Sequence, residues 1–300
     1  RQAAIINVSI ASGIILLVLV IIVVNRLIIT RKQKKAISQQ KLEIEQQKEE
    51  IWLAHEEITD SIAYAKRIQS AILPPNSLIK EILPTGFVLY IPKDVVAGDF
   101  YWMEKVGDKT LFAAADCTGH GVPGAMVSVV CNNALNRAVR EFGLTDPAKI
   151  LDKVREIVIQ EFEKSEEEVL DGMDIALCSL EGNTLRYSGA NNPLWIVRDN
   201  DVIEIKGDKQ PIGKYDDLKP FSNHQVEIQP GDTIYIFSDG YQDQFGGESG
   251  KKFKSGTLKK LILSIQDQTI ENQEKLLRDR IVEWQGSYEQ VDDICFMGVE

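Results

Sequence analysis

Histidine and cysteine are scarce in this chain, which has three histidines and four cysteines. The cysteines are Cys117, Cys131, Cys178 and Cys295, and no two of them form a Cys-x-x-Cys pair. This spacing excludes a zinc site built from closely spaced cysteines, and scattered single cysteines are typical of proteins in a reducing cytoplasm.

An excess of positive charge is also missing. The formal net charge is −11, and Lys and Arg outnumber Asp and Glu only within residues 1–74. Nucleic-acid-binding domains carry a basic patch or stripe, so we expect no nucleic acid partner for the acidic remainder. Carboxylates that bind a metal ion would account for part of this negative charge.

One apolar run stands out against the rest of the sequence. Residues 5–24 are long enough to span the roughly 30 Å hydrocarbon layer of a membrane. Basic residues follow this run, whereas a signal peptide has its charge before the run and a small-residue cleavage site after it. We therefore predict that residues 1–29 are a single-pass anchor in the inner, cytoplasmic membrane, with everything after Thr30 in the cytoplasm. Because the chain begins with Arg1 and not Met, we expect it to come from a longer protein with a sensor before it.

A seven-residue repeat follows the basic flank. The repeated positions are Ile37, Ile44, Ile51, Ile58, Ala65 and Ile72. Their partner positions are mostly polar, so the pattern predicts a marginally stable parallel coiled coil, and hence a homodimer, over residues 30–73. Such a coil is either a signalling linker, in which a modest energy is enough to rotate the helices or shift their register, or a static stalk. Leu73-Pro74-Pro75 should end the helix, because proline cannot continue it.

Four aspartates stand beside apolar, strand-like runs. They are Asp99 in Val-Ala-Gly-Asp-Phe, Asp116 in Ala-Asp-Cys-Thr-Gly-His-Gly, Asp239 in Phe-Ser-Asp-Gly and Asp292 in Val-Asp-Asp-Ile. Each alone is explained as a turn residue. Together they predict carboxylates gathered at strand ends, where a divalent cation offsets their repulsion, and all-oxygen ligands favour Mg²⁺ or Mn²⁺.

A glycine-rich turn follows Asp116. Gly119, Gly121 and Gly124 surround Pro123, and an apolar-periodic stretch at residues 125–142 comes next. This order predicts a strand, a turn and then a helix with proline in its first turn. The N–H groups at such a helix start can bind an anion beside the metals, so the site is expected to handle phosphate.

The rest of the chain alternates between strand and helix signals. Strands are expected at residues 87–91, 111–115, 175–180, 185–188, 194–197, 202–205, 233–237 and 294–299, and helices near 125–142, 147–163, 257–264 and 270–285. Consecutive strands without intervening helices imply antiparallel sheets covered by helices, an α+β fold. We see no internal linker and expect one domain over residues 74–300.

Six ordered segments resemble the SpoIIE-type branch of the metal-dependent PPM (protein phosphatase 2C-like) superfamily. They are Ala-Gly-Asp-Phe-Tyr, Ala-Asp-Cys-Thr-Gly-His-Gly-Val-Pro-Gly-Ala, Ser-Gly-Ala-Asn-Asn-Pro-Leu, Gln-Pro-Ile-Gly, Phe-Ser-Asp-Gly and Asp-Asp-Ile, and the similarity covers about Leu73 to Glu300. The upstream Ala-Lys-Arg-Ile-Gln-Ser-Ala-Ile-Leu-Pro also resembles the helix that leads into this domain. The resemblance implies an αββα sandwich with metals at one edge between the sheets.

The resemblance also implies roles for individual residues. Asp116 matches the aspartate that bridges two Mn²⁺ or Mg²⁺ ions, and the carbonyl of Cys117 matches the next ligand. Asp239 and Asp292 match further ligands of the first metal, Asp99 matches a ligand near the second, and Asp293 ranks below Asp292. The implied reaction is in-line attack of water on the phosphorus of phosphoserine or phosphothreonine. The implied partner is a phosphorylated protein such as an anti-sigma-factor antagonist.

Three residues depart from the family pattern or only partly match it. His120 lies four residues beyond Asp116, whereas the histidine that acts as an acid in better-known relatives follows an Asp-Gly pair, so proton transfer by His120 is a weak expectation. Asn191 stands where many relatives have histidine. Asp174, in Gly-Met-Asp-Ile, matches a recurrent acid, and Gly119 and Gly121 are expected to support the turn.

Other classes compete with a phosphatase. Ala-Gly-Asp-Phe resembles the signature of diguanylate cyclases, but Ala97 and Phe100 occupy positions where that motif needs glycine and an acid. His55-Glu56 could serve a histidine kinase, but no nucleotide-binding motif follows. A catalytically silent pseudophosphatase scaffold is the remaining alternative.

Overall fold

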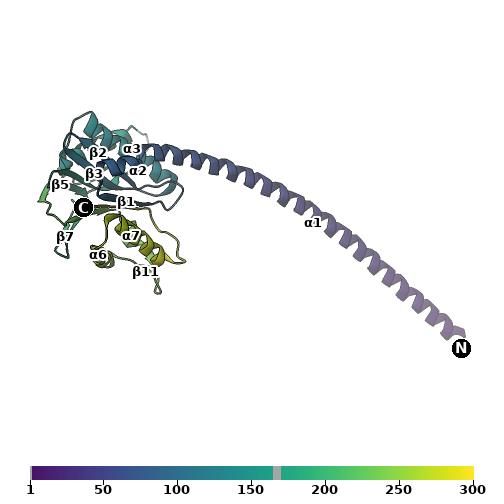
Figure 1. Cartoon of the computed structure of the whole chain (residues 1–300). Coiled ribbons are helices and arrows are strands. Elements are labelled where there is room, and N and C mark those ends of the chain that lie inside the picture. Colours follow the sequence, from purple (N-terminus) through teal and green to yellow (C-terminus); the bar gives the residue numbers. More distant parts are fainter. Residues whose placement is uncertain (1, 165–169) are drawn as a thin grey trace. The chain divides into compact units, whose positions relative to one another are not determined.

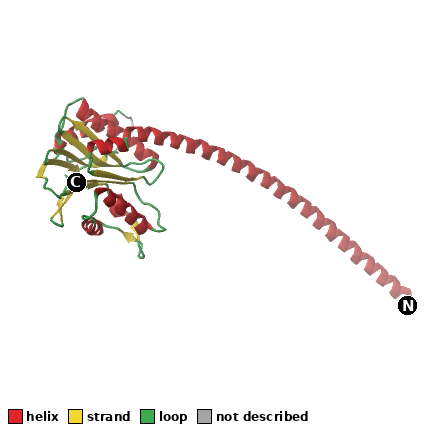
Figure 2. Ribbon diagram, viewed as in Figure 1, coloured by secondary structure: helices red, strands yellow, loops and turns green. Residues whose placement is uncertain are grey.

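The computed structural model describes residues 2–164 and 170–300 (Figures 1 and 2). The chain divides into two compact units, Arg1–Ser61 and Ile62–Glu300. Helix α1, Gln2–Ile72, makes up the described part of the first unit and contributes its last turns to the second. It ends at Ile72, directly before Leu73-Pro74-Pro75, as predicted.

The first unit exposes its apolar side chains. The helix is long and apolar enough to cross a membrane, judged by length and composition. Four of the heptad isoleucines, Ile37, Ile44, Ile51 and Ile58, are also exposed. A row of large exposed apolar side chains is the pattern expected of a surface that pairs with another molecule.

Two five-stranded sheets form the centre of the second unit. The first has the order β1 (Gly86–Ile91), β12 (Ile294–Val299), β9 (Thr233–Phe237), β6 (Leu194–Arg198), β7 (Asp201–Ile205). The second has the order β2 (Phe100–Val106), β3 (Lys109–Cys117), β4 (Met173–Glu181), β5 (Thr184–Ala190), β8 (His224–Glu227). Every neighbouring pair is antiparallel, as predicted from the consecutive strands.

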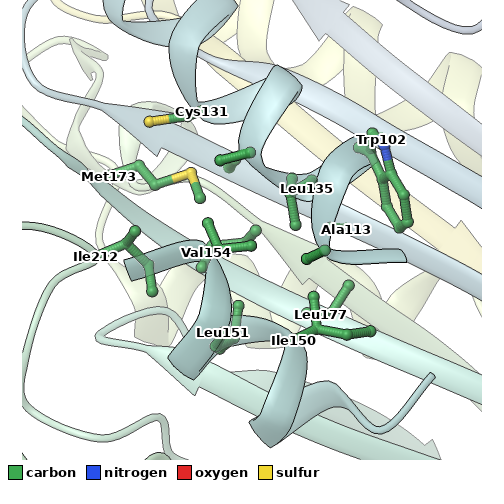
Figure 3. Packing of buried hydrophobic residues seen from close by; sticks show 14 of the residues in the cluster. Trp102, Ala113, Cys131, Leu135, Ile150, Leu151, Val154, Met173, Leu177 and Ile212 are labelled. Carbon is green, nitrogen blue, oxygen red and sulfur yellow. The ribbon is translucent and has the colours of Figure 1, made fainter. Parts of the chain in front are cut away.

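Helices cover both outer faces. In Figure 1, α3 (Gly121–Arg140) lies on one side of the sheets, and α6 (Ser255–Ser264) and α7 (Ile270–Gln285) lie on the other. Helix α4 (Pro147–Phe162) packs beside α3, and the short α2 (Asn76–Ile82) packs on β1 and β2. Figure 3 shows Leu135 of α3 and Val154 of α4 in one cluster with Leu177 of β4. The order helix, sheet, sheet, helix confirms the expected α+β architecture.

Strand β3 shows why the central strands appear as continuous apolar runs. Leu111, Ala113 and Ala115 face the helices, whereas Phe112 and Ala114 face the other sheet. Both faces are buried, so the usual alternation of apolar and polar residues is absent. The helix ends follow local chemistry: the side chain of Asp146 caps α4 and that of Thr269 caps α7.

Some elements differ from the sequence-based expectation. Strands β2 and β8, helix α2 and the short elements α5 (Gly240–Asp243), β10 (Phe245–Gly246) and β11 (Lys251–Lys252) were not predicted. Strands β2 and β8 are sheet edges with polar residues in their sequence, so their pairing depends on a neighbour that the local pattern does not reveal. Helix α3 begins at Gly121, earlier than expected, with Pro123 in its first turn as predicted.

Phe296 tests the packing under α6 and α7. Its buried ring stacks on Phe237 at a centroid distance of 5.0 Å and touches Tyr241. Phe296→Ala should lower the free energy of unfolding of the Ile62–Glu300 fragment by about 3–5 kcal/mol, because it leaves a cavity in a closed core. Urea denaturation measures this. The control Val282→Ala, at a side chain that is 60% exposed, should change the free energy of unfolding by no more than about 0.5 kcal/mol. Equal losses in the two variants would contradict the packing of Phe296.

Candidate active site

A cavity of about 310 Å³ lies where strands of both sheets end. Four carboxylates line it, those of Asp116, Asp174, Asp239 and Asp292. The other lining residues are Cys117, Thr118, Gly119, His120, Leu170, Gly172, Met173, Pro211, Gly213 and Lys214. The structure therefore gathers three of the four motif aspartates, together with Asp174, around one opening.

The strand register places these carboxylates. Asp116 of β3 lies directly opposite Asp174 of β4 in the antiparallel pair, where two like charges destabilise the sheet. Asp239 follows β9 and precedes α5, and Asp292 lies just before β12. Because β9 and β12 are antiparallel neighbours, the end of one meets the start of the other. Each sheet thus delivers two acids to the same end of the sandwich.

Burial and mutual repulsion change the acidity of this group. Burial, followed by the charges of Asp239, Asp292 and Asp174, raises the pKa of Asp116 to about 8, although the backbone N–H of Asp239 opposes the shift. Burial and the neighbouring charge of Asp243 raise the pKa of Asp239 to about 6. Burial also raises the pKa of Asp174, and a 2.8 Å hydrogen bond from the Asn191 amide opposes it. A bound cation would remove this penalty.

Asp99 lies behind the cavity and does not line it. The residue is only 2% exposed, and the Ser238 hydroxyl donates a hydrogen bond to its carboxylate. Burial and the nearby charge of Asp116 raise the pKa of Asp99 well above its ordinary value. The two aspartates therefore interact electrostatically, and the place of Asp99 near a second metal stays a prediction.

Asp292 and Asp293 are neighbours in sequence but have different surroundings. The two carboxylate oxygens of buried Asp293 accept hydrogen bonds from the backbone N–H groups of Lys93 and Gly98, both at 2.7 Å. Asp293 thus holds the loop that leads to Asp99. This geometry favours a positioning role for Asp293 and leaves Asp292 as the acid that faces the cavity.

Three glycines allow the motif loops to approach one another. Gly119 has a φ of +82°, a conformation that favours glycine. A Cβ atom on Gly98 would lie 2.2 Å from the Gly119 carbonyl oxygen, and one on Gly124 would lie 2.1 Å from it. The Asp99 loop, the Asp116 loop and the start of α3 therefore meet at this carbonyl, and larger residues would separate them. Gly121 also has a positive φ, of 63°.

His120 lies at the exposed rim, directly before α3. Its Nδ1 is 2.8 Å from Asp94 Oδ2, and its Nε2 is 2.9 Å from Lys93 Nζ. Because a lysine ammonium can only donate, Nε2 accepts this bond and the Nδ1–H donates to Asp94. The ring therefore lines the cavity with both nitrogens engaged, and proton transfer by His120 stays a prediction.

Sequence reasoning missed several residues that support this site. Three of them are in or near the motifs, but no periodic pattern in the sequence marks them as site residues: Ser238, Lys93 and Asp94. Gln69 of α1 is buried, and its amide bonds both the N–H of Ala97 at 3.1 Å and the carbonyl of Ala97 at 2.6 Å. Its segment, Arg-Ile-Gln-Ser-Ala-Ile-Leu-Pro, carried a family resemblance, which was the one available signal.

The donor chemistry fits a divalent cation. Among the described residues, no three His, Cys, Asp or Glu side chains are grouped closely enough in this structure to hold an ion. The cavity nevertheless presents four carboxylates beside the backbone of Cys117, and oxygen donors of this kind suit Mg²⁺ or Mn²⁺. Burial and mutual repulsion raise the pKa of Asp116 to about 8 and that of Asp239 to about 6, and a cation beside these acids would offset both effects.

A family model and a curated relative both match a large part of the chain. The family described as Stage II sporulation protein E (SpoIIE) matches residues 107–300. The phosphoserine phosphatase RsbU of Bacillus subtilis (strain 168) is 26% identical over 190 residues, which are 62% of this chain and 54% of that protein. The chain thus spans about half the length of this curated relative.

Solved structures share the fold. The SiaA-PP2C domain of Pseudomonas aeruginosa is 32% identical with a TM-score of 0.75, over 82% of this chain and 98% of that one. The RsbU and RsbW domains of Rv1364c from Mycobacterium tuberculosis have 20% identity and a TM-score of 0.58, over 72% and 60%. The first is similar in sequence and fold, and the second in fold alone.

Asp116→Asn tests the repulsion in the cavity. The folded pKa of Asp116, about 8, lies above its ordinary value of 3.8, so the metal-free fold loses stability as pH rises from about 4 to about 8. Asparagine removes this charge and should raise the melting temperature in EDTA at pH 8.5, with a much smaller effect at pH 5. Thermal unfolding of the Ile62–Glu300 fragment measures both. The exposed control Asp108→Asn should show no such pH-dependent gain, and an unchanged melting temperature for Asp116→Asn would contradict the electrostatics.

Proposed function

The chain belongs to the SpoIIE family of PP2C-type serine phosphatases, and from this premise we propose that it hydrolyses phosphoserine or phosphothreonine on a cytoplasmic regulatory protein. The observation that carries the proposal is the group of four carboxylates from two sheets around one cavity. The raised pKa of Asp116 supports it, because acids whose pKa is strongly shifted are typical of functional sites.

Some residues around the cavity would bind the metals, and others orient a neighbouring side chain or favour the anion. Asp116, Asp239, Asp292 and the Cys117 carbonyl would hold two Mn²⁺ or Mg²⁺ ions, with Asp99 near the second. When bound, the ions supply Lewis-acid catalysis, lowering the pKa of a water and offsetting phosphate charge. Asp174 is oriented by the Asn191 amide. The N-terminal N–H groups of α3, which begins beside the cavity, favour an anion there.

The substrate is proposed from the relatives. The curated relative is named a phosphoserine phosphatase, and a solved relative contains RsbU and RsbW domains. We therefore propose a phosphorylated anti-sigma-factor antagonist as the substrate. The acidic net charge of the chain argues against a nucleic acid partner.

The first unit is proposed to be an anchor and a regulator. The exposed apolar run at residues 5–24 supports a single-pass helix in the cytoplasmic membrane, and the basic residues after it support a cytoplasmic catalytic domain. The exposed heptad isoleucines support a parallel homodimer. Gln69, at the end of the same helix, bonds the loop that leads to Asp99, so this contact provides a route from coil to site.

The competing classes fit the structure less well. In a diguanylate cyclase, Ala-Gly-Asp-Phe would form part of an open active site, whereas Asp99 is buried and bonded to Ser238. Membership in the SpoIIE family also makes the cyclase interpretation wrong. An assay of metal-dependent phosphate hydrolysis decides between an active phosphatase and the pseudophosphatase alternative.

Metal-dependent turnover is expected of the catalytic fragment. The Ile62–Glu300 fragment should hydrolyse a phosphoserine peptide and p-nitrophenyl phosphate with Mn²⁺ or Mg²⁺, and EDTA should abolish turnover. Asp239→Asn should lower kcat by about a hundredfold or more, because it weakens stabilisation worth several kcal/mol. The control Asp279→Asn, on the exposed face of α7, should keep the wild-type rate. Full activity in EDTA, or in Asp239→Asn, would refute the mechanism.

Control of the phosphatase activity by the coiled coil is also expected. Residues 30–300 should be dimeric and should differ in specific activity from Ile62–Glu300. Ile51→Asp with Ile58→Asp should dissociate the dimer and shift the rate towards that of the shorter fragment, because unpaired charge is costly in an apolar seam. Sedimentation and phosphatase assays measure both effects.

The matched control places the same charges off the seam. Gln46→Asp with Thr59→Asp should leave the dimer and its rate unchanged. A monomeric parent protein, or a dissociated dimer with an unchanged rate, would show that the segment is a passive stalk.

A further inference from the structure

A buried arginine lies in the middle of α4. Arg155 is only 9% exposed and lies among apolar residues that pack on the sheet, such as Leu151 and Val158. A buried guanidinium is costly unless several partners satisfy it, and its planar fork holds those partners in a fixed geometry. The partners of Arg155 therefore indicate what it holds.

All the polar partners of Arg155 that the structure shows lie on α4 itself or at the two ends of one loop. Its Nη2 donates to Asp152 Oδ1 at 2.9 Å, and its Nη1 donates to Gln210 Oε1 at 3.1 Å and to the Lys219 carbonyl at 2.9 Å. The guanidinium also lies 4.7 Å from the centre of the Phe221 ring. One side chain thus contacts the chain both before and after residues 211–218.

Further hydrogen bonds close the loop at the same place. The Gln210 amide donates to the Lys219 carbonyl at 2.9 Å and accepts from the Lys219 N–H at 3.0 Å. The Phe221 N–H donates to Asp152 Oδ1 at 3.1 Å. Residues 211–218 are therefore fastened at both ends to α4 through Arg155 and Asp152.

The fastened loop forms one wall of the active-site cavity. Pro211, Gly213 and Lys214 line the cavity. Between them, the backbone of Ile212 exchanges two hydrogen bonds with Met173, the residue before Asp174, and Figure 3 shows these two side chains in the same apolar cluster. The first half of the loop is thus held beside the carboxylates.

The second half of the loop turns apolar side chains to the outside. Tyr215 is 48% exposed and Leu218 is 43% exposed. Large exposed apolar side chains beside a catalytic opening are suited to contact with a protein surface. A small phosphate ester would fill only the cavity, whereas a folded phosphoprotein would extend over the loop.

We propose that Arg155 is a positioning residue for substrate recognition, which holds residues 211–218 so that Tyr215 and Leu218 contact the phosphoprotein around its phosphoserine. This inference rests on the proposed phosphatase function and adds the surface that distinguishes a protein substrate from a small ester. Arg155 itself is not among the residues that line the cavity.

The test compares two substrates in the same enzyme. They are a folded, serine-phosphorylated anti-sigma-factor antagonist domain and p-nitrophenyl phosphate, both assayed with Mn²⁺. Arg155→Met should raise KM for the phosphoprotein about five- to tenfold, as when an interface contact is lost, and should change kcat/KM for the small ester less than about twofold. Arg155→Lys should lie between, because lysine keeps the charge but not the forked geometry.

Two further variants keep the test decisive if Arg155→Met does not fold. Tyr215→Ser with Leu218→Ser changes only exposed side chains and should give the same selective rise in KM. Arg198→Met is the matched control, because Arg198 is also anchored to an aspartate and a carbonyl, those of Asp232 and Glu227, but away from the cavity. Arg198→Met should leave the ratio of kcat/KM for the phosphoprotein to kcat/KM for p-nitrophenyl phosphate unchanged.

Each outcome gives a separate answer. A selective loss for the phosphoprotein in both the Arg155 and the loop variants supports the inference. Equal losses for both substrates, or no change in the loop variant, overturn it while leaving the phosphatase assignment intact. A wild-type enzyme that hydrolyses neither substrate overturns the proposed function and this inference together.

Discussion

The repulsion among half-buried carboxylates is the constraint on which the catalytic end of the molecule depends. Sheet register places Asp116 opposite Asp174, and the turn after β9 adds Asp239. Left alone, these charges favour protonation, as the raised pKa values of Asp116 and Asp239 show. A divalent cation converts the same repulsion into a binding site. The fold must therefore hold the acids together against this repulsion.

Rigid packing and a few polar contacts supply that restraint. The strands that carry the acids are buried on both faces, so they cannot move apart without opening the core. The loops between them are held by single polar residues: Asp293 holds the Asp99 loop, Gln69 bonds Ala97, and Arg155 holds the loop after Gln210. The core thus fixes the positions of the acids, and the polar contacts fix the loops around them.

Local patterns predicted much of the fold and the main site. The runs at β9 and β12 were predicted with their observed bounds, because buried strands are apolar on both faces. Strands β2 and β8 were missed, because edge strands obtain their structure from one neighbour. Gln69 and Arg155 gave no local signal of their roles, since a polar residue within a helix looks the same whether it faces solvent or a distant loop.

The sequence by itself determined which acids are present, which of them follow strand-like runs, and where glycine permits a tight turn, because these properties depend on near neighbours along the chain. Only the tertiary structure decided that Asp292 faces the cavity while Asp293 turns to Lys93 and Gly98, which lie 200 and 195 residues away. The two acids have the same chemistry. Their surroundings differ because sheet pairing and loop closure bring distant backbone N–H groups to one carboxylate and leave the other facing the cavity.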